Sequence, residues 1–143
     1  MKMQTIERVE RAIVNTGAQL RQIPLQGLKA ITIKAGGKYG VFVDVGDFSR
    51  ISERAAAEAH ECGHVATGTV HSLGSPLEEI GRHELKADRW AVHRFLPWGK
   101  IKKAMRSGYT DAWQLAEYFD FDERFIRIAL YVYRIEGKLN ADL

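Results

Sequence analysis

The sequence predicts an α+β domain that is mostly helical and contains one small antiparallel sheet. Two observations support this: two β-rich runs flank a Gly-Gly turn, and most other segments carry apolar residues at helical spacing. The 143 residues show no repeat and no low-complexity tract. We therefore expect residues 1–143 to form a single domain whose C-terminal part, at about 98–137, is helical.

The predicted elements follow one another with clear breaks between them. The strands span 30–34 and 39–45, and Pro24 favours a loop or extended chain in residues 18–30. Helices are expected at 5–16, 52–70, 76–96, 98–107, 111–119 and 122–135. The side chains that can cap helix N-termini are Thr5, Ser52, Ser75, Thr110 and Asp122.

Composition and charge exclude several classes of protein. No run of about 18 apolar residues exists, so no membrane span is expected. The charged N-terminus lacks the apolar core of a secretory signal. The single cysteine, Cys62, excludes an internal disulfide and fits a reducing cytoplasm. The net charge of +3 is small, so solvated helix faces explain the basic residues better than direct binding of nucleic acid.

The middle of the chain contains His60-Glu61-Cys62-Gly63-His64, a match to the metal-binding pattern H-E-x-x-H. On a helix the side chains of His60 and His64 lie about 40° apart, so they can share one metal ion at roughly 2.0–2.1 Å. Glu61 points about 100° from His60, where a carboxylate can take a proton from a water molecule beside the ion. The motif therefore supplies two ligands and a general base.

The two inner residues of the motif have structural interpretations. Gly63 costs a helix about 0.5–1 kcal/mol relative to alanine, so we expect a neighbouring strand or a substrate backbone to pack closely against it. Cys62 points about 200° from His60, away from the metal, and we interpret it as a small buried apolar residue in the core.

A catalytic zinc usually has three protein ligands, so one more is needed. Glu84 and Asp88 lie four residues apart on one face of a predicted helix. If Glu84 binds the metal, Asp88 can accept a hydrogen bond from a ligand histidine. His71 is the main rival, because it ends a pattern similar to H-E-x-x-H-x-x-G-x-x-H, with one extra residue before the glycine. Weaker rivals are His83 and His93.

This ordered set of residues resembles the ImmA/IrrE-type metallopeptidases. The family pattern is H-E-x-G-H, a short linker, a helix of the kind E-x-x-A-D-x-W-A and a Leu-Pro stop, matched here by residues 60–64, 84–91 and 96–97. The helical tail is also similar, so the resemblance covers about residues 30–136. One departure is Lys86, where many relatives carry an acid, and no ligand depends on it.

The resemblance implies a gluzincin-like fold, with the small sheet packed on the H-E-x-x-H helix, and a zinc-dependent endopeptidase activity. By the same resemblance His60, His64 and Glu84 hold one Zn²⁺ ion, and Glu61 is the catalytic base. Members of the family act in bacteria, phages or integrating elements, where they cleave or antagonise a helix-turn-helix transcriptional repressor. We therefore expect a repressor of this kind as the protein substrate, in the cytoplasm and without a membrane partner.

The strand 39–45 is expected to form an exposed edge that holds substrate as an added strand, through Tyr39, Val41 and Val43. Tyr39 and Tyr109 are candidates to stabilise the oxyanion. Two other functions stay open. One is a zinc-containing protein that sequesters a repressor without cutting it, and the other is a DNA-binding module built on the basic helices.

Overall fold

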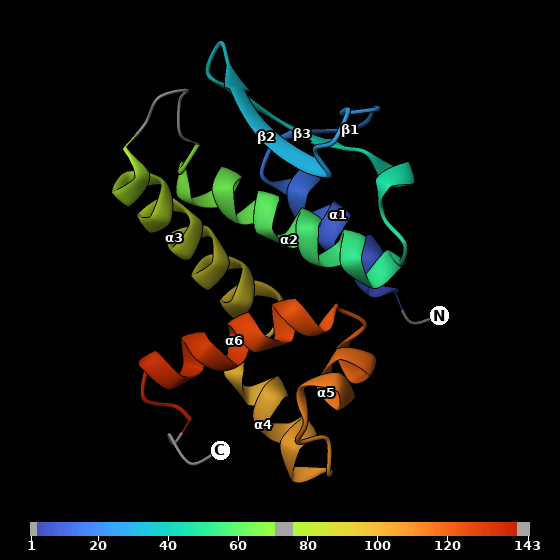
Figure 1. The fold of residues 1–143 in the computed structure, drawn as a ribbon, viewed down its shortest axis with the longest axis vertical. Coiled ribbons are helices and arrows are strands. Elements are labelled where there is room, and N and C mark those ends of the chain that lie inside the picture. The colour runs from blue at the N-terminus through green and yellow to red at the C-terminus, as the bar shows by residue number, and fades with distance from the viewer. Residues whose placement is uncertain (1–2, 71–75, 140–143) are drawn as a thin grey trace.

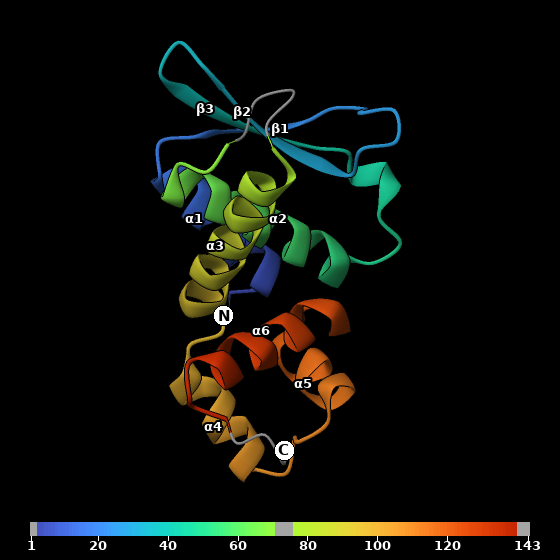
Figure 2. The same ribbon diagram turned by 60° about the vertical axis from the view of Figure 1, so that its left-hand side comes forward.

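The computed structural model describes residues 3–70 and 76–139, which form two tiers (Figures 1 and 2). The helices are α1 (Thr5–Asn15), α2 (Ile51–Thr67), α3 (Leu77–Phe95), α4 (Trp98–Arg106), α5 (Ala112–Phe119) and α6 (Glu123–Ile135). The strands are β1 (Gln19–Gln22), β2 (Ala30–Ala35) and β3 (Lys38–Val43). The predicted α+β class with a helical majority is thus confirmed. Within the described ranges, no helix is both long and apolar enough to cross a membrane.

The first tier consists of the sheet lying over α1 and α2, with α3 crossing beside α2, and the second consists of α4, α5 and α6. Two buried hydrogen bonds join the tiers. The Thr5 hydroxyl on α1 donates to the carbonyl oxygen of Phe119 at 2.9 Å, and the Tyr133 hydroxyl on α6 donates to that of Leu96 at 2.7 Å. The second tier is therefore anchored to the elements that carry the motif.

The sheet has the strand order β1-β3-β2. The antiparallel β2–β3 hairpin confirms the prediction, and its turn is made by Gly36 and Gly37, both with positive φ, as a two-residue hairpin turn requires. β1 pairs in parallel with β3 and adds a strand to the predicted pair. This strand ends at Gln22, before Pro24 can interrupt its hydrogen bonds.

β3 is the central strand, which corrects the prediction that 39–45 is an exposed edge. It is paired with β1 on one side and with β2 on the other. Val41 and Val43 are fully buried, and Tyr39 is half-buried. The edge-strand role predicted for these three residues is therefore wrong, because β1 covers the side that the sequence left open.

The helix limits lie close to the predicted ones, but three of the predicted caps are displaced. The Asp122 prediction is confirmed, since its Oδ1 accepts a hydrogen bond of 2.9 Å from the Phe125 N–H. The prediction for Ser75 lies outside the described residues. The residues that precede α1, α2 and α5 are Gln4, Arg50 and Asp111, in place of Thr5, Ser52 and Thr110.

Candidate metal centre

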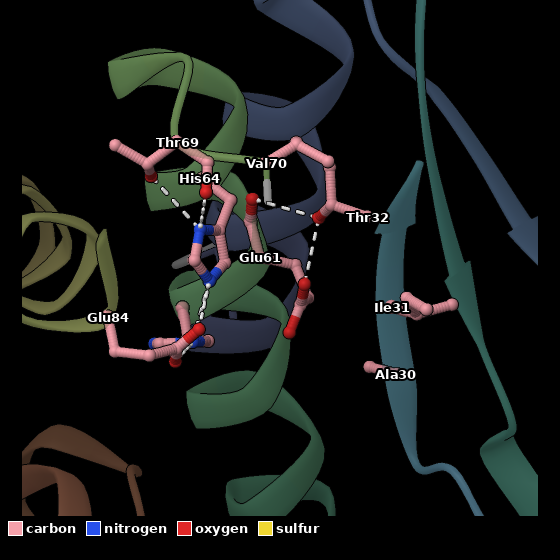
Figure 3. Close-up of a pocket in the computed structure, with 9 residues that line it drawn as sticks. Ala30, Ile31, Thr32, Glu61, His64, Thr69, Val70 and Glu84 are labelled. Atoms are coloured by element: carbon pink, nitrogen blue, oxygen red, sulfur yellow. Dashed lines mark hydrogen bonds and ion pairs between the residues drawn. The ribbon is translucent and has the colours of Figure 1, made fainter. Parts of the chain in front are cut away.

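Three side chains from two helices converge on one point, and we call His60, His64 and Glu84 the metal centre. His64 extends from α2, and Glu84 extends toward it from α3 (Figure 3). His60 lies four residues before His64 on α2, and its ligand nitrogen joins the same group. His60 Nε2 lies 2.7 Å from Glu84 Oε2, His64 Nε2 lies 3.0 Å from Glu84 Oε1, and the two Nε2 atoms are 3.1 Å apart. Such a group could hold a metal ion.

The spacing of these atoms fits shared coordination. Two ligand atoms at about 2.0–2.1 Å from a tetrahedral ion are about 3.3 Å from each other. The three separations of 2.7, 3.0 and 3.1 Å lie slightly below that value. Small outward movements of the side chains would therefore bring the three ligand atoms to this spacing.

The outer nitrogen of each histidine ring has its own acceptor. His60 Nδ1 donates to Asp88 Oδ1 at 2.7 Å, the role that the four-residue spacing from Glu84 predicts. His64 Nδ1 lies 3.0 Å from both the carbonyl oxygen and the hydroxyl of Thr69. These acceptors hold a proton on Nδ1 of each ring, so Nε2, which faces the shared point, is the nitrogen that can bind a metal ion once it has lost its own proton.

Thr69 is a site residue that the sequence analysis missed. α2 ends at Gly68, whose left-handed conformation, with a φ of 68°, turns the chain back toward the preceding turn of helix. The Thr69 N–H then donates to the His64 carbonyl oxygen at 3.1 Å, and the buried Thr69 side chain meets the ring of the same histidine. A glycine directly after the motif helix is the signal that could have indicated this contact.

The charges around the metal centre favour a cation. Burial lowers the pKa of His60, but hydrogen bonds to Asp88 and then Glu84 outweigh it and raise that pKa to about 10. Hydrogen bonds from His60 and His64 hold the pKa of the Glu84 carboxyl far below its usual range. The negative charge that keeps a proton on His60 would equally attract a metal ion to the same point.

Gly63 allows α2 and α3 to approach closely enough for Glu84 to reach the histidines. A β-carbon at position 63 would lie 2.9 Å from the carbonyl carbon of Ala87 and 3.1 Å from its α-carbon. The predicted close packing is therefore found, but the partner is the backbone of α3, not a strand or a substrate. This crossing sets the position of the third ligand.

Glu61 lies beside the metal centre, on the side of the sheet. Its Oε1 accepts a hydrogen bond of 2.8 Å from the Thr32 hydroxyl on β2 (Figure 3). Glu61 lines a cavity of about 260 Å³ next to β2 and another of about 560 Å³ that extends toward α6. His60 and Glu84 line both cavities, so the metal centre is accessible from both.

Among the described residues, no strand pairs with the outer edge of β2, which lies next to the smaller cavity. The Asp44 N–H donates to the Lys29 carbonyl oxygen at 2.9 Å, so this pair is hydrogen-bonded across the hairpin. Bonding alternates along an antiparallel pair, and the next bonded residue is Ile31. The N–H and C=O groups of Ala30 and Thr32 therefore face away from β3, toward the cavity that both residues line.

Among the described residues, two other candidate histidines, His83 and His93, lie outside the metal centre. His83 Nε2 is 3.8 Å from Glu79 Oε1 on the same helix, and His93 Nε2 is 2.8 Å from Glu136 Oε2 on the second tier. His71 lies outside the described residues. The structure therefore assigns neither His83 nor His93 to the cluster.

The remaining predictions concern two tyrosines and the cysteine. Tyr39 and Tyr109 are absent from the lining of both cavities at the metal centre, and Tyr109 packs on Tyr118, with ring centroids 4.8 Å apart. Cys62 is fully buried, as predicted, and burial raises the pKa of its thiol to about 11. It is therefore a core residue and lines neither cavity at the metal centre.

Comparisons of this chain with protein-family models, with curated proteins and with solved structures find no match.

Proposed function

We propose that this chain is a zinc-dependent endopeptidase with a gluzincin-like site that hydrolyses a peptide bond in a partner protein. The observation that carries the proposal is the convergence of the metal centre on one point, with Glu61 beside it at an accessible cavity. The resemblance of residues 60–64 and 84–91 to ImmA/IrrE-type metallopeptidases supports the same proposal.

The donor set favours one zinc ion over the hard cations. Two imidazole nitrogens and one carboxylate oxygen, with space for a fourth ligand, are typical of catalytic zinc sites. Calcium and magnesium prefer oxygen ligands throughout. Zinc bound there would polarise the scissile carbonyl and lower the pKa of a bound water molecule toward about 7.

Glu61 is the proposed general base. It follows His60 directly on α2, so its side chain leaves the helix about 100° away from the ligand face. From this position its carboxylate takes the proton of the attacking water and passes it to the leaving nitrogen. Both cavities that Glu61 lines also reach His60 and Glu84, so substrate on either side meets the base and the metal centre together.

The substrate is proposed to bind as an added strand on the free edge of β2. The outward N–H and C=O groups of Ala30 and Thr32 can pair with an extended peptide, and both residues line the same cavity as Glu61. Main-chain hydrogen bonds would hold the peptide, while the larger cavity next to Phe125 and Ile128 accepts side chains.

The proposed partner is a helix-turn-helix repressor in the cytoplasm, and the support for it is the sequence resemblance. Cleavage of such a protein would release transcription, whereas binding without cleavage would sequester it. Cleavage requires the proton-transferring carboxylate of Glu61, whereas sequestration does not.

The test compares wild-type protein with Glu61→Gln, each loaded with one equivalent of zinc and checked by metal analysis. A library of internally quenched peptides serves as substrate, and chelated protein serves as the blank. We expect cleavage by the wild type alone and equal zinc content in both proteins. A wild type that holds zinc but cleaves no peptide, or a Glu61→Gln variant with full activity, would refute the enzyme.

A further inference from the structure

Thr32 contacts both of the functional regions described above. Its backbone N–H and C=O face the free edge of β2, and its side chain faces α2 on the inner side of the sheet, opposite the buried Val41. The residue is only 7% exposed, so its hydroxyl is shielded from bulk water. One residue thus joins the strand that would hold substrate to the helix that carries the metal centre.

The hydroxyl of Thr32 has two acceptors on the same residue of α2. Its Oγ1 lies 2.8 Å from Glu61 Oε1 and 3.3 Å from the Glu61 carbonyl oxygen. A hydroxyl has a single proton, and the shorter contact, to a carboxylate, is the stronger one. The hydrogen bond therefore restrains Glu61 through Oε1 and leaves Oε2 for the reacting water.

The threonine side chain is suited to this restraint. Branching at its β-carbon restricts rotation about χ1, so the position of Oγ1 follows the backbone of β2 closely. A glutamate side chain on its own has three rotatable torsions and would sample orientations that point away from the cavity. With Thr32 in place, the position of the carboxylate depends on the same backbone that pairs with the substrate.

We infer that Thr32 is a positioning residue that aligns the Glu61 carboxylate with the scissile peptide bound on β2. The inference rests on the proposed peptidase function and deepens it. According to this inference, the Thr32 side chain ensures that a peptide bound in the correct register on β2 has its scissile bond next to the carboxylate that transfers the proton. It predicts that the hydroxyl contributes to turnover, while substrate affinity and metal binding do not depend on it.

The test uses Thr32→Val, which removes the hydroxyl and keeps the branched shape, and Thr32→Ser, which keeps the hydroxyl on a freer side chain. Thr5→Val is the matched control, because Thr5 is also 7% exposed and its hydroxyl donates a buried hydrogen bond far from the metal centre. Each protein is assayed with one equivalent of zinc, against a quenched peptide that the wild type cleaves. Zinc content, kcat and KM are measured for all of them.

For Thr32→Val we expect kcat to fall about 10- to 100-fold, the scale of a misplaced catalytic group, with KM and zinc content unchanged. Thr32→Ser should recover most of the lost kcat, and Thr5→Val should retain the wild-type kcat. If Thr32→Val does not fold, Thr32→Ala provides a second variant without the hydroxyl.

Three results would overturn the inference. Wild-type kcat in a folded variant without the hydroxyl refutes the positioning role and leaves the peptidase intact. A loss of kcat matched by equal loss of zinc shows that Thr32 supports only the fold of the site. Absence of cleavage by zinc-loaded wild type refutes the peptidase itself, and the role of Thr32 with it.

Discussion

Helix α2 carries polar groups on two opposite sides, and their surroundings differ. On one side the metal centre faces two cavities. On the other side Glu58 is fully buried, with its Oε2 3.2 Å from Arg54 Nε, and Arg54 Nη2 lies 3.9 Å from Glu10 Oε2 on α1. We call Glu58, Arg54 and Glu10 the buried cluster.

The metal centre and the buried cluster differ in the direction in which their polar atoms point. In the metal centre the outer nitrogens have acceptors, so the inner atoms converge on a point that solvent can reach. In the buried cluster, burial and then the neighbouring carboxyl group of Glu10 raise the pKa of Glu58 to about 9. Among the described residues, Glu58 Oε1, Glu58 Oε2 and Glu10 Oε2 have no hydrogen-bond donor, and a proton held between the two carboxyl groups would supply one. Ligand atoms that converge toward a solvent-accessible cavity indicate a binding site. Polar groups that other side chains enclose completely indicate a role in helix–helix packing.

The largest effect is expected for Glu84→Ala, which removes the ligand from α3. Zinc affinity should fall more than about 100-fold, beyond the usual loss of an outer partner, as measured by competition with a chelator. The side chain of Glu84 is 41% exposed, so the fold should survive. His71→Ala is the control and should retain zinc. The reverse result, with zinc lost only in His71→Ala, would contradict the assignment of Glu84.

Gly63→Ala tests whether the close crossing of α2 and α3 builds the metal centre. The added methyl group would overlap the backbone of Ala87, so the free energy of unfolding should drop by about 1–3 kcal/mol. Zinc affinity should drop with it, because Glu84 moves away from the histidines. Gly81→Ala on α3 has open space at its β-carbon and should be neutral or slightly stabilising. Chemical denaturation and zinc titration measure both effects.

Substitutions of Asp88 and Thr69, which accept hydrogen bonds from the Nδ1 atoms of the two histidines, should lower zinc affinity to different extents. Asp88→Ala removes the only carboxylate bonded to His60 Nδ1 within the described ranges, so zinc affinity should fall about 10- to 100-fold. Thr69→Val removes one of two acceptors at His64 and keeps the carbonyl oxygen, so its loss should be smaller. Calorimetric zinc titration ranks the two variants. Equal affinities in both and in the wild type would show that ring orientation does not depend on these contacts.

The smallest effect concerns the buried cluster. Glu58 has a pKa of about 9 in the folded protein and 4.5 as the ordinary value, so its contribution to stability is complete below about pH 4.5. That contribution is lost as the pH rises toward 9. Glu58→Gln cannot ionise, so its melting temperature should fall less than that of the wild type between neutral pH and pH 9. If the melting temperatures of the wild type and of Glu58→Gln fall by the same amount across this pH range, the raised pKa of Glu58 is contradicted.

Much of the metal centre could be predicted because its geometry is local. A four-residue spacing places His60 and His64 on one face of any helix, and the same spacing relates Glu84 to Asp88. The hairpin was predictable for the same reason, since its two glycines determine the turn. These features depend on residues that are close in the sequence.

The features that sequence reasoning missed depend on distant pairings. β1 is a short polar strand, QLRQ, whose pairing with β3 is not visible in its own composition. Without it, the edge of the sheet was assigned to β3 in place of β2. Thr32 and Thr69 meet the motif only because the sheet lies over α2 and the chain reverses at Gly68.

The metal centre joins α2 and α3, which follow each other in the chain, so a bound ion would be a reversible cross-link between these two helices. Each tenfold rise in free metal above the dissociation constant would add about 1.4 kcal/mol to the stability of the folded state. Resistance of the first tier to heat and proteolysis would therefore track metal supply. The second tier provides no ligand among the described residues, but it shares one hydrophobic core with the first, so the same gain in stability would extend to it.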